Sequence, residues 1–174
     1  MIGEALKQKV DKALEWALIL LMGANVLNVL WQVFTRFVLR HPSSFTEELA
    51  RFLLIWVGLL GASYASGKKM HLAIEVVVDR LKGKSRIWME VFIQSFVFLF
   101  ALLVMVIGGI RLVTITLLLG QTSAALSLKL GYVYLVIPLS GLLILFYSLL
   151  FLISALYKLR QSQDLVGERS VQEV

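Results

Sequence analysis

Apolar residues fall into four long runs, which are separated by charged or turn-forming segments. Crossing the hydrocarbon layer of a bilayer takes about 20 mainly apolar residues, and a spanning segment must satisfy its own backbone, which favours helices. The pattern therefore predicts an all-α integral membrane protein. A single four-helix transmembrane domain is expected at residues 1–160 and a polar tail at 161–174, with spans at about 16–35, 48–67, 89–111 and 131–157.

Two places in this pattern are irregular. Pro138 lies inside the fourth span, where it has no N–H to donate and is expected to kink the helix and free a carbonyl. The apolar residues 112–128 follow the third span. They either extend the third helix or lie along the outer membrane surface, and the sequence leaves both possibilities open.

Two further segments have the one-sided apolar spacing of helices that lie on a membrane surface. The stronger pattern covers residues 71–84, where Ile74, Val77 and Leu81 follow helical spacing. Residues 4–16 show a weaker version of it. We therefore expect one or two amphipathic interfacial helices, with ordinary juxtamembrane connectors as the alternative.

Basic residues are distributed unevenly between the connecting segments. Of the 17 Lys and Arg residues, twelve lie in the N-terminal tail, in the loop between the second and third spans, and in the C-terminal tail. Segments rich in Lys and Arg stay in the cytoplasm, so this bias predicts that both termini are cytoplasmic. The first apolar run is too long for a signal peptide, and we expect it to be retained. The five remaining basic residues are expected at the outer side: Arg36, Arg40, Arg51, Arg111 and Lys129.

The composition limits the chemistry and the partners. The chain is 59% hydrophobic and 16% charged, whereas a soluble domain carries about a quarter charged residues. It has no cysteine, which excludes disulfides and thiolate chemistry. The net charge is +6, and the basic residues flank the apolar runs instead of forming a stripe. We therefore expect membrane lipid as a partner and no nucleic acid.

Acidic residues are missing from the predicted apolar cores. All eleven Asp and Glu residues lie outside these cores, at about residues 16–35, 52–66, 91–110 and 130–157, whereas a proton-coupled carrier needs an ionisable group at membrane depth. His41 and His71 fall in loops, although haem ligands would have to lie on the helices. Neither a nucleophile with its base nor a phosphate-binding glycine loop is recognisable. We therefore expect neither an enzyme nor a metal or cofactor in this chain.

Two helix faces carry residues suited to helix–helix packing in a membrane. The first span has a row of polar side chains, and the second has a face of small residues that admits a close neighbour. Each face could pack within this chain or against another subunit, and both interpretations stay open here. The polar row is Asn25, Asn28, Gln32 and Arg36, and the small residues are Gly58, Gly61, Ala62 and Ala65.

The stretch SSFTEELARFLLIW, residues 43–56, places charges at the start of the second span. Ser44 and Glu47 have the spacing of a capping box, and Glu47 and Glu48 would lie in the first turn, where the helix dipole favours anions. Arg51 is within pairing distance of both carboxylates on a helix. The charges therefore form either a self-neutralising helix start or a docking site for a partner at the outer side.

From about residue 15 to 157 the sequence resembles a known family, the DctQ-like small membrane subunits of tripartite ATP-independent periplasmic (TRAP) transporters. The resemblance is strongest over FTEELARFLLIWVGLLGASYASGKKMHLAIEVVVDRL, and WQVFTRFVLRHP and YVYLVIPLSG add to it. The sequence departs from the family pattern at Phe45, where Trp is common, at Glu75, where Asp is frequent, and in TSAALSL, which lacks a frequent proline. The matching residues of the strongest stretch are Phe45, Thr46, Glu47, Glu48, Leu49, Ala50, Arg51, Trp56, Gly61, Ala62, His71 and Glu75.

The resemblance implies a scaffold subunit in the bacterial inner membrane. In such a system a large elevator-type membrane subunit holds the substrate and sodium sites. A periplasmic binding protein delivers an organic acid, such as a dicarboxylate, sialic acid or a similar carboxylate. The small subunit would pack against the large transmembrane subunit and help to dock the binding protein.

The residues singled out in this chain are therefore expected to form partner interfaces. Two alternative functions are a self-sufficient small multidrug-type exporter and a membrane anchor subunit of a respiratory enzyme. The candidates at the outer side are Arg36, Arg40, Glu47, Glu48 and Arg51, and those within the bilayer are Asn25, Asn28, Gln32, Gly58, Gly61 and Ala62.

Overall fold

The computed structural model describes residues 2–40, 43–68 and 84–172, and every regular element within these residues is a helix. Within these described ranges, four helical segments are long and apolar enough to cross a membrane, in agreement with the four predicted spans. They cover Ala5–Phe37, Ser44–Gly67, Trp88–Leu118 and Leu130–Ser154.

The third and fourth spans are each built from more than one helical element. In the third, an eight-residue π-helix joins two α-helices without a break in the chain. In the fourth, a short helix and a long one are separated by a single residue. The elements in chain order are α1 (Ile2–Phe37), α2 (Ser44–Gly67), α4 (Lys84–Phe100), η1 (Ala101–Gly108), α5 (Gly109–Leu118), α6 (Leu130–Tyr134) and α7 (Val136–Gln172).

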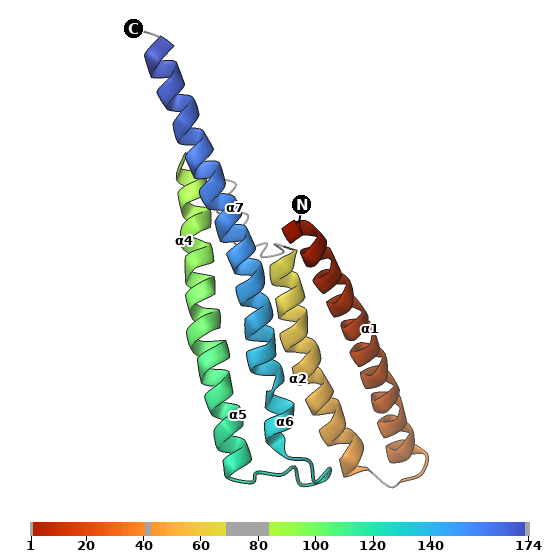
Figure 1. Cartoon of the computed structure of the whole chain (residues 1–174). Coiled ribbons are helices and arrows are strands. Elements are labelled where there is room, and N and C mark those ends of the chain that lie inside the picture. The colour runs from red at the N-terminus through yellow and green to blue at the C-terminus, as the bar shows by residue number, and fades with distance from the viewer. Residues whose placement is uncertain (1, 41–42, 69–83, 173–174) are drawn as a thin grey trace.

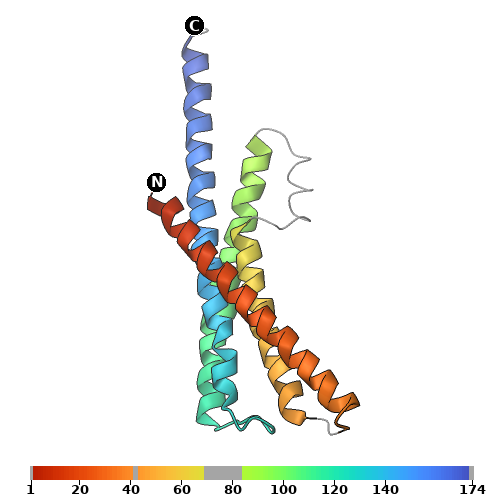
Figure 2. The same ribbon diagram turned by 90° about the vertical axis from the view of Figure 1, so that its right-hand side faces the viewer.

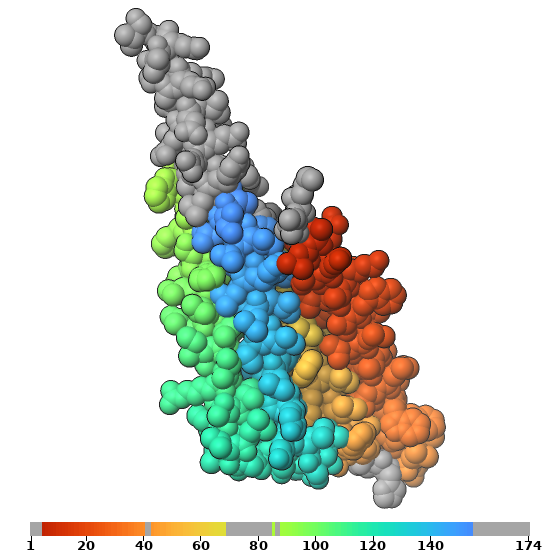
Figure 3. Space-filling model, in the orientation of Figure 1, coloured from red at the N-terminus to blue at the C-terminus, as the bar shows by residue number. Residues whose placement is uncertain are grey.

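The four spans form an open row in place of a closed bundle (Figure 1). Helix α2 packs against α1 on one side and α7 on the other, and α7 packs in turn against α4 and η1. Viewed from the side, α1 crosses α2 at an angle (Figure 2). The space-filling view shows the spans side by side in the same order (Figure 3). Helix α1 and the α4–η1–α5 rod are therefore the two edges of the row.

Close packing inside the row depends on glycines. A Cβ atom on Gly141 of α7 would lie 2.7 Å from Cβ of Met105 in η1, and one on Gly109 would lie 3.0 Å from Cδ of Pro138. Real Cβ atoms essentially never approach closer than 3.0 Å, so a side chain at Gly141 would force the third and fourth spans apart, and one at Gly109 would be tight. These glycines let the two spans pack backbone to backbone, as small residues do between membrane helices.

The fourth span breaks near Pro138, as predicted, but the break itself lies at Leu135, between α6 and α7. Because Pro138 has no N–H, the carbonyl of Tyr134 loses its helical donor, and α6 ends at this residue. The Nε1–H group of Trp56 donates to the neighbouring Val133 carbonyl at 3.1 Å. A side chain of α2 thus satisfies a backbone acceptor at the break.

The third span extends further than the sequence indicated. Helix α5 continues to Leu118, so Arg111 lies two turns inside a membrane-length helix and not at its outer end. Of the stretch that the sequence left open, residues 112–118 are helical and the rest forms a loop. The loop folds back on itself through a bridge between Thr122 and Lys129.

Other boundaries also differ from the expected ones. Residues 4–16 form the beginning of α1, continuous with the first span, and not a separate surface helix. The predicted interfacial helix at residues 71–84 lies outside the described residues except for Lys84, where α4 begins. Helix α7 runs on to Gln172, so the backbone of residues 161–172 continues the fourth span as a projecting helix (Figure 1).

Candidate partner interface

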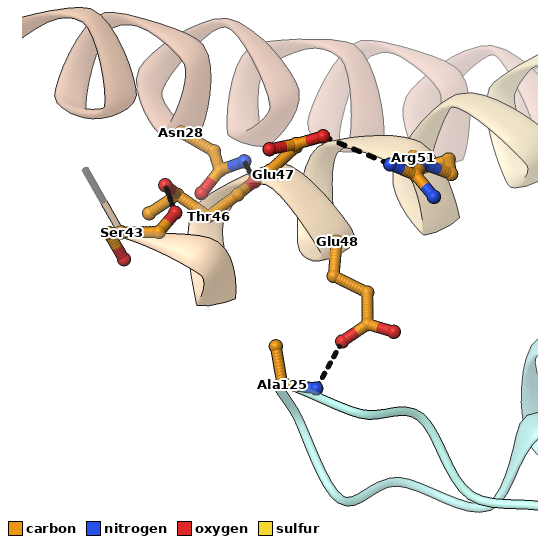
Figure 4. A network of polar contacts seen from close by, with 7 residues as sticks. All are labelled: Asn28, Ser43, Thr46, Glu47, Glu48, Arg51 and Ala125. Carbon is orange, nitrogen blue, oxygen red and sulfur yellow. Dashed lines mark hydrogen bonds and ion pairs between the residues drawn. The ribbon is translucent and has the colours of Figure 1, made fainter. Parts of the chain in front are cut away.

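The adjacent carboxylates of Glu47 and Glu48 face different surroundings at the start of α2 (Figure 4). Glu47 Oε1 accepts a hydrogen bond from Arg51 Nη2 at 3.0 Å, and both side chains are more than 60% exposed. Glu48 Oε2 instead accepts hydrogen bonds from the backbone N–H groups of Ala125 and Leu126, at 2.8 and 3.1 Å. The predicted pair between Glu47 and Arg51 is therefore present, whereas Glu48 fixes the loop before α6.

The predicted capping box of Ser44 and Glu47 is wrong. The N-cap residue is Ser43, so Ser44 is already the first helical residue and Glu47 lies beyond the box position. Ser43 has no side-chain capping bond among the described residues. In its place, the Thr46 hydroxyl donates to the Ser43 carbonyl at 2.9 Å (Figure 4). A start one residue earlier leaves Glu47 free to pair with Arg51.

Helix α2 is bonded to the chain from Ala125 to Ser140 at three levels, which we call the α2–α7 seam. Each hydrogen bond joins residues that are 77 positions apart, so the two segments run in parallel and in constant register. The three α2 residues lie within one side of the helix, about two turns apart. The pairs are Glu48–Ala125, Trp56–Val133 and Ser63–Ser140.

Some of the polar side chains along α1 contact other residues of the same chain. Asn28 Nδ2 donates to the Thr46 carbonyl of α2 at 2.8 Å (Figure 4), so this residue packs within the chain. Gln32 is half-buried. Asn25 Oδ1 is buried and has no hydrogen-bond partner in the part of the chain that the structure describes. Asn28 therefore lies at the α1–α2 contact, whereas the Asn25 side-chain oxygen lacks a hydrogen-bond donor within the described residues.

The small residues of α2 do not all share one surface. A Cβ atom on Gly61 would contact Cδ2 of Leu18 in α1, at 4.0 Å. Gly58 and Ala62 are exposed, and nothing lies within 4 Å of a Cβ placed on Gly58. Gly61 therefore serves internal packing, while Gly58 and Ala62 continue the exposed face on which Glu47 and Arg51 lie.

The two remaining candidates, Arg36 and Arg40, are exposed at the end of α1 and in the turn that follows it. Neither makes a hydrogen bond or an ion pair with the other described residues. Arg40 has a positive φ of 50°, a conformation that is uncommon outside glycine and asparagine. The structure thus places both cations at the same end of the spans as Glu47, and within the described residues their guanidinium groups have no partner.

A second polar cluster lies at the other end of the spans from Glu47. The sequence analysis did not predict it. Tyr147 of α7 is fully buried and its hydroxyl donates to Asp11 Oδ1 of α1 at 2.6 Å. The other oxygen, Oδ2, lies 3.5 Å from Lys7 Nζ and 3.7 Å from Lys68 Nζ. The cluster joins α1, α2 and α7. The Lys7–Asp11 spacing of four residues could have suggested the ion pair, but no local pattern marks Tyr147 as its partner.

Several polar side chains of this fold join one helix to another helix or to a loop far along the chain. No group of three or more His, Asp or Glu side chains that could hold a metal ion occurs in the searched, described residues. A row of four membrane-length helices joined by these bonds defines a multi-pass membrane protein.

Comparison with known proteins identifies the family. A sequence model of the DctQ component of the tripartite ATP-independent periplasmic transporters matches residues 25–158, which is most of the chain. The chain therefore belongs to the DctQ component family of TRAP transporters. The resemblance found in the EELAR stretch and the Trp56 region is thereby confirmed.

Two curated relatives share part of the sequence. The sialic acid TRAP transporter small permease protein SiaQ of Vibrio cholerae is 37% identical over 67 residues, which cover 38% of this chain and 39% of that protein. The sialic acid TRAP transporter permease protein SiaT of Haemophilus influenzae is 36% identical over 67 residues, which cover 38% of this chain and 11% of that protein. The matched stretch thus spans less than half of either relative.

Proposed function

We propose that this chain is the small, stationary membrane subunit of a TRAP transporter that imports an organic acid. In this proposal it packs against a large elevator-type permease subunit, which holds the substrate and sodium sites, and it helps to dock a periplasmic binding protein. Both termini are in the cytoplasm, and the turn after α1, the start of α2 and the loop before α6 face the periplasm. The protein resides in the bacterial inner membrane.

The observation that carries the proposal is the division of α2 into a face bonded to its own chain and an exposed face. One face forms the α2–α7 seam and makes the row rigid through hydrogen bonds inside the chain. The other face presents Glu47, Arg51, Gly58 and Ala62 to the outside. Small exposed residues allow a helix of another subunit to approach closely in lipid. A stationary subunit needs this combination of internal rigidity and an open face.

The relative from Haemophilus influenzae supports a large permease as the partner. The stretch of SiaT that is similar to this chain makes up 11% of a permease protein, so most of that polypeptide lies outside the matched stretch. A sequence like this one can therefore belong to the same molecule as a much larger permease. In our proposal the small and large parts are separate chains that still pack against each other.

The proposed periplasmic end has the features of a docking surface. Glu48 holds the loop at Ala125 and Leu126, so the loop is fixed relative to α2. The cations Arg36 and Arg40 lie exposed at the same end. Charges on a rim of this kind steer a charged partner more than they add affinity. We propose that the binding protein meets this end of the row.

The test is co-expression of the tagged chain with the products of the genes adjacent to its own, including any large permease, followed by purification in detergent. Recovery of a stoichiometric complex supports the proposal, as does sodium-dependent uptake by the reconstituted complex with its binding protein. A panel of sialic acid, dicarboxylates and other carboxylates then identifies the substrate. Recovery of the chain alone as an active homo-oligomer would establish the exporter alternative, and a haem absorbance band would establish the respiratory anchor.

A further inference from the structure

Arg111 is an exposed arginine on the outermost helix of the row. Helix α5 buries Gly109, Val113 and Thr116, which face the rest of the chain. Arg111 lies two positions after Gly109, which is about 200° around the helix. Its side chain therefore projects away from the chain's own packing surface.

The surroundings of Arg111 are apolar and at membrane depth. The third span ends at Leu118, so Arg111 lies roughly 10 Å inside its end along the helix axis. The adjacent surface consists of exposed Ile107, Ile115 and Leu118, of which Leu118 is 80% exposed. Arg111 makes no hydrogen bond or ion pair with any other described residue. A charged side chain in such a place is costly unless it finds a partner.

The direction of the helix makes it unfavourable for the Arg111 guanidinium to reach the nearer lipid headgroups. The Cα–Cβ bonds of an α-helix tilt towards its N-terminus. The rod runs from α4 to the end of α5, so Arg111 starts out towards the middle of the span and away from Leu118. A long side chain near a helix end reaches the interface best when it points the other way.

We propose that Arg111 pairs with a carboxylate on a transmembrane helix of the large permease, and that the α5 edge is an intramembrane docking surface. This inference rests on the function proposed above and adds the chemistry of the contact. An arginine offers a carboxylate two parallel N–H···O bonds, which suits a pair removed from water.

The residues one turn on either side of Arg111 suit this occupant. Gly108 and Thr114 are both exposed and small, so the backbone of a second helix can come close. The Thr114 hydroxyl already donates to the Ile110 carbonyl, so it adds no unsatisfied group. The charge, the small neighbours and the apolar rim together match a partner helix with one acid at the same depth.

The most discriminating variant is Arg111→Leu, because leucine suits lipid and does not hinder membrane insertion. Tagged wild type, Arg111→Leu, Arg111→Lys and the control Lys12→Glu are each co-expressed with the large permease. Lys12 is an exposed lysine of α1. We expect Arg111→Leu to recover at least tenfold less permease than wild type, since the partner's acid is left unpaired. Arg111→Lys should lose only a few-fold, and Lys12→Glu should match wild type.

Each outcome decides the question. If Arg111→Leu recovers as much permease as wild type, Arg111 faces lipid and the inference is overturned, while the proposed function stands. If wild type itself recovers no permease, the proposed function fails and this inference fails with it. Each variant is also purified alone, where helical content and a monodisperse elution equal to wild type show that a loss of permease reflects lost assembly.

Discussion

Polar groups have partners in the α2–α7 seam, whereas the charged group at the outer edge of α5 has none among the described residues. In the seam, a carboxylate, an indole and a hydroxyl each meet a backbone group of the same chain. On α5, Arg111 is surrounded by exposed apolar side chains and has no partner among the described residues. Trp56, Ser63 and Arg111 all lie in apolar spans, where an unsatisfied polar group is costly. The polar groups of the seam are therefore satisfied within the chain, whereas the α5 edge carries the charge for which we propose a partner in another subunit.

The same contrast appears within one turn of α2. Glu47 and Glu48 are chemically identical and adjacent, but one residue is a rotation of about 100° around the helix. Glu48 therefore reaches the loop at Ala125, while Glu47 stays on the exposed face with Arg51. The two acids therefore differ in their contacts: Glu48 fixes the loop, whereas Glu47 remains exposed beside Arg51.

The largest expected effect comes from closing the space between the third and fourth spans. Gly141→Ala should lower the free energy of unfolding by about 1 to 3 kcal/mol, because the new Cβ would lie 2.7 Å from Met105 Cβ. Gly58→Ala is the matched control: its Cβ meets nothing, and stability should stay unchanged or rise slightly. Thermal unfolding of the purified chain in detergent measures both. Equal effects of the two variants would contradict the close approach.

Removal of the Glu48 carboxylate should come next. Glu48→Ala should lower the free energy of unfolding, since two backbone N–H groups lose a charged acceptor. Amide hydrogen exchange should accelerate at Ala125 and Leu126. Glu47→Ala, as the control, should cost less than about 1 kcal/mol and leave those amides unchanged, because its ion pair is exposed. Acceleration of exchange in the Glu47 variant would erase the distinction between the two acids.

Trp56→Phe tests the bond at the break in the fourth span. The ring stays aromatic, but the Val133 carbonyl loses its donor, so we expect a loss of about 1 kcal/mol. Trp88 is 65% exposed, and Trp88→Phe should be neutral to within about 0.5 kcal/mol. Chemical unfolding in mixed micelles provides the comparison. A neutral Trp56→Phe would show that water or another group replaces the indole.

The smallest effect on the isolated chain is expected for Arg51→Ala. The exposed pair with Glu47 should contribute less than about 1 kcal/mol to folding. In the assembled transporter, however, we expect the same change to reduce complex yield and uptake, because it removes a charge from the open face. Unfolding of the isolated chain and uptake by reconstituted complex separate these contributions. Wild-type yield and uptake would remove Arg51 from the interface.

The parts that depend on composition and on short spacing were predictable from the sequence. Four spans follow from apolar runs of membrane length. The pair between Glu47 and Arg51 follows from a spacing of four residues on a helix. The effect of Pro138 on the fourth span also follows from its missing donor, although the break falls three residues earlier.

Features that depend on long-range packing were not predictable. The register that joins Trp56 to Val133 links residues 77 positions apart, and no local pattern reports it. The partnership of Tyr147 with Asp11 has the same origin. Arg111 was placed at the outer end of the third span because a charge usually marks a boundary, whereas α5 continues past it to Leu118. Arg111 is thus an exception to this pattern, and it is the residue that we propose contacts the partner subunit.

The most direct test of the account is photo-crosslinking from the α5 edge inside living cells. A photoreactive phenylalanine derivative at Leu118 lies on the Arg111 face and is highly exposed. When the complete transporter is expressed, the account predicts a covalent adduct between this chain and the large permease. Adducts with lipid alone, or with a second copy of this chain, would contradict it.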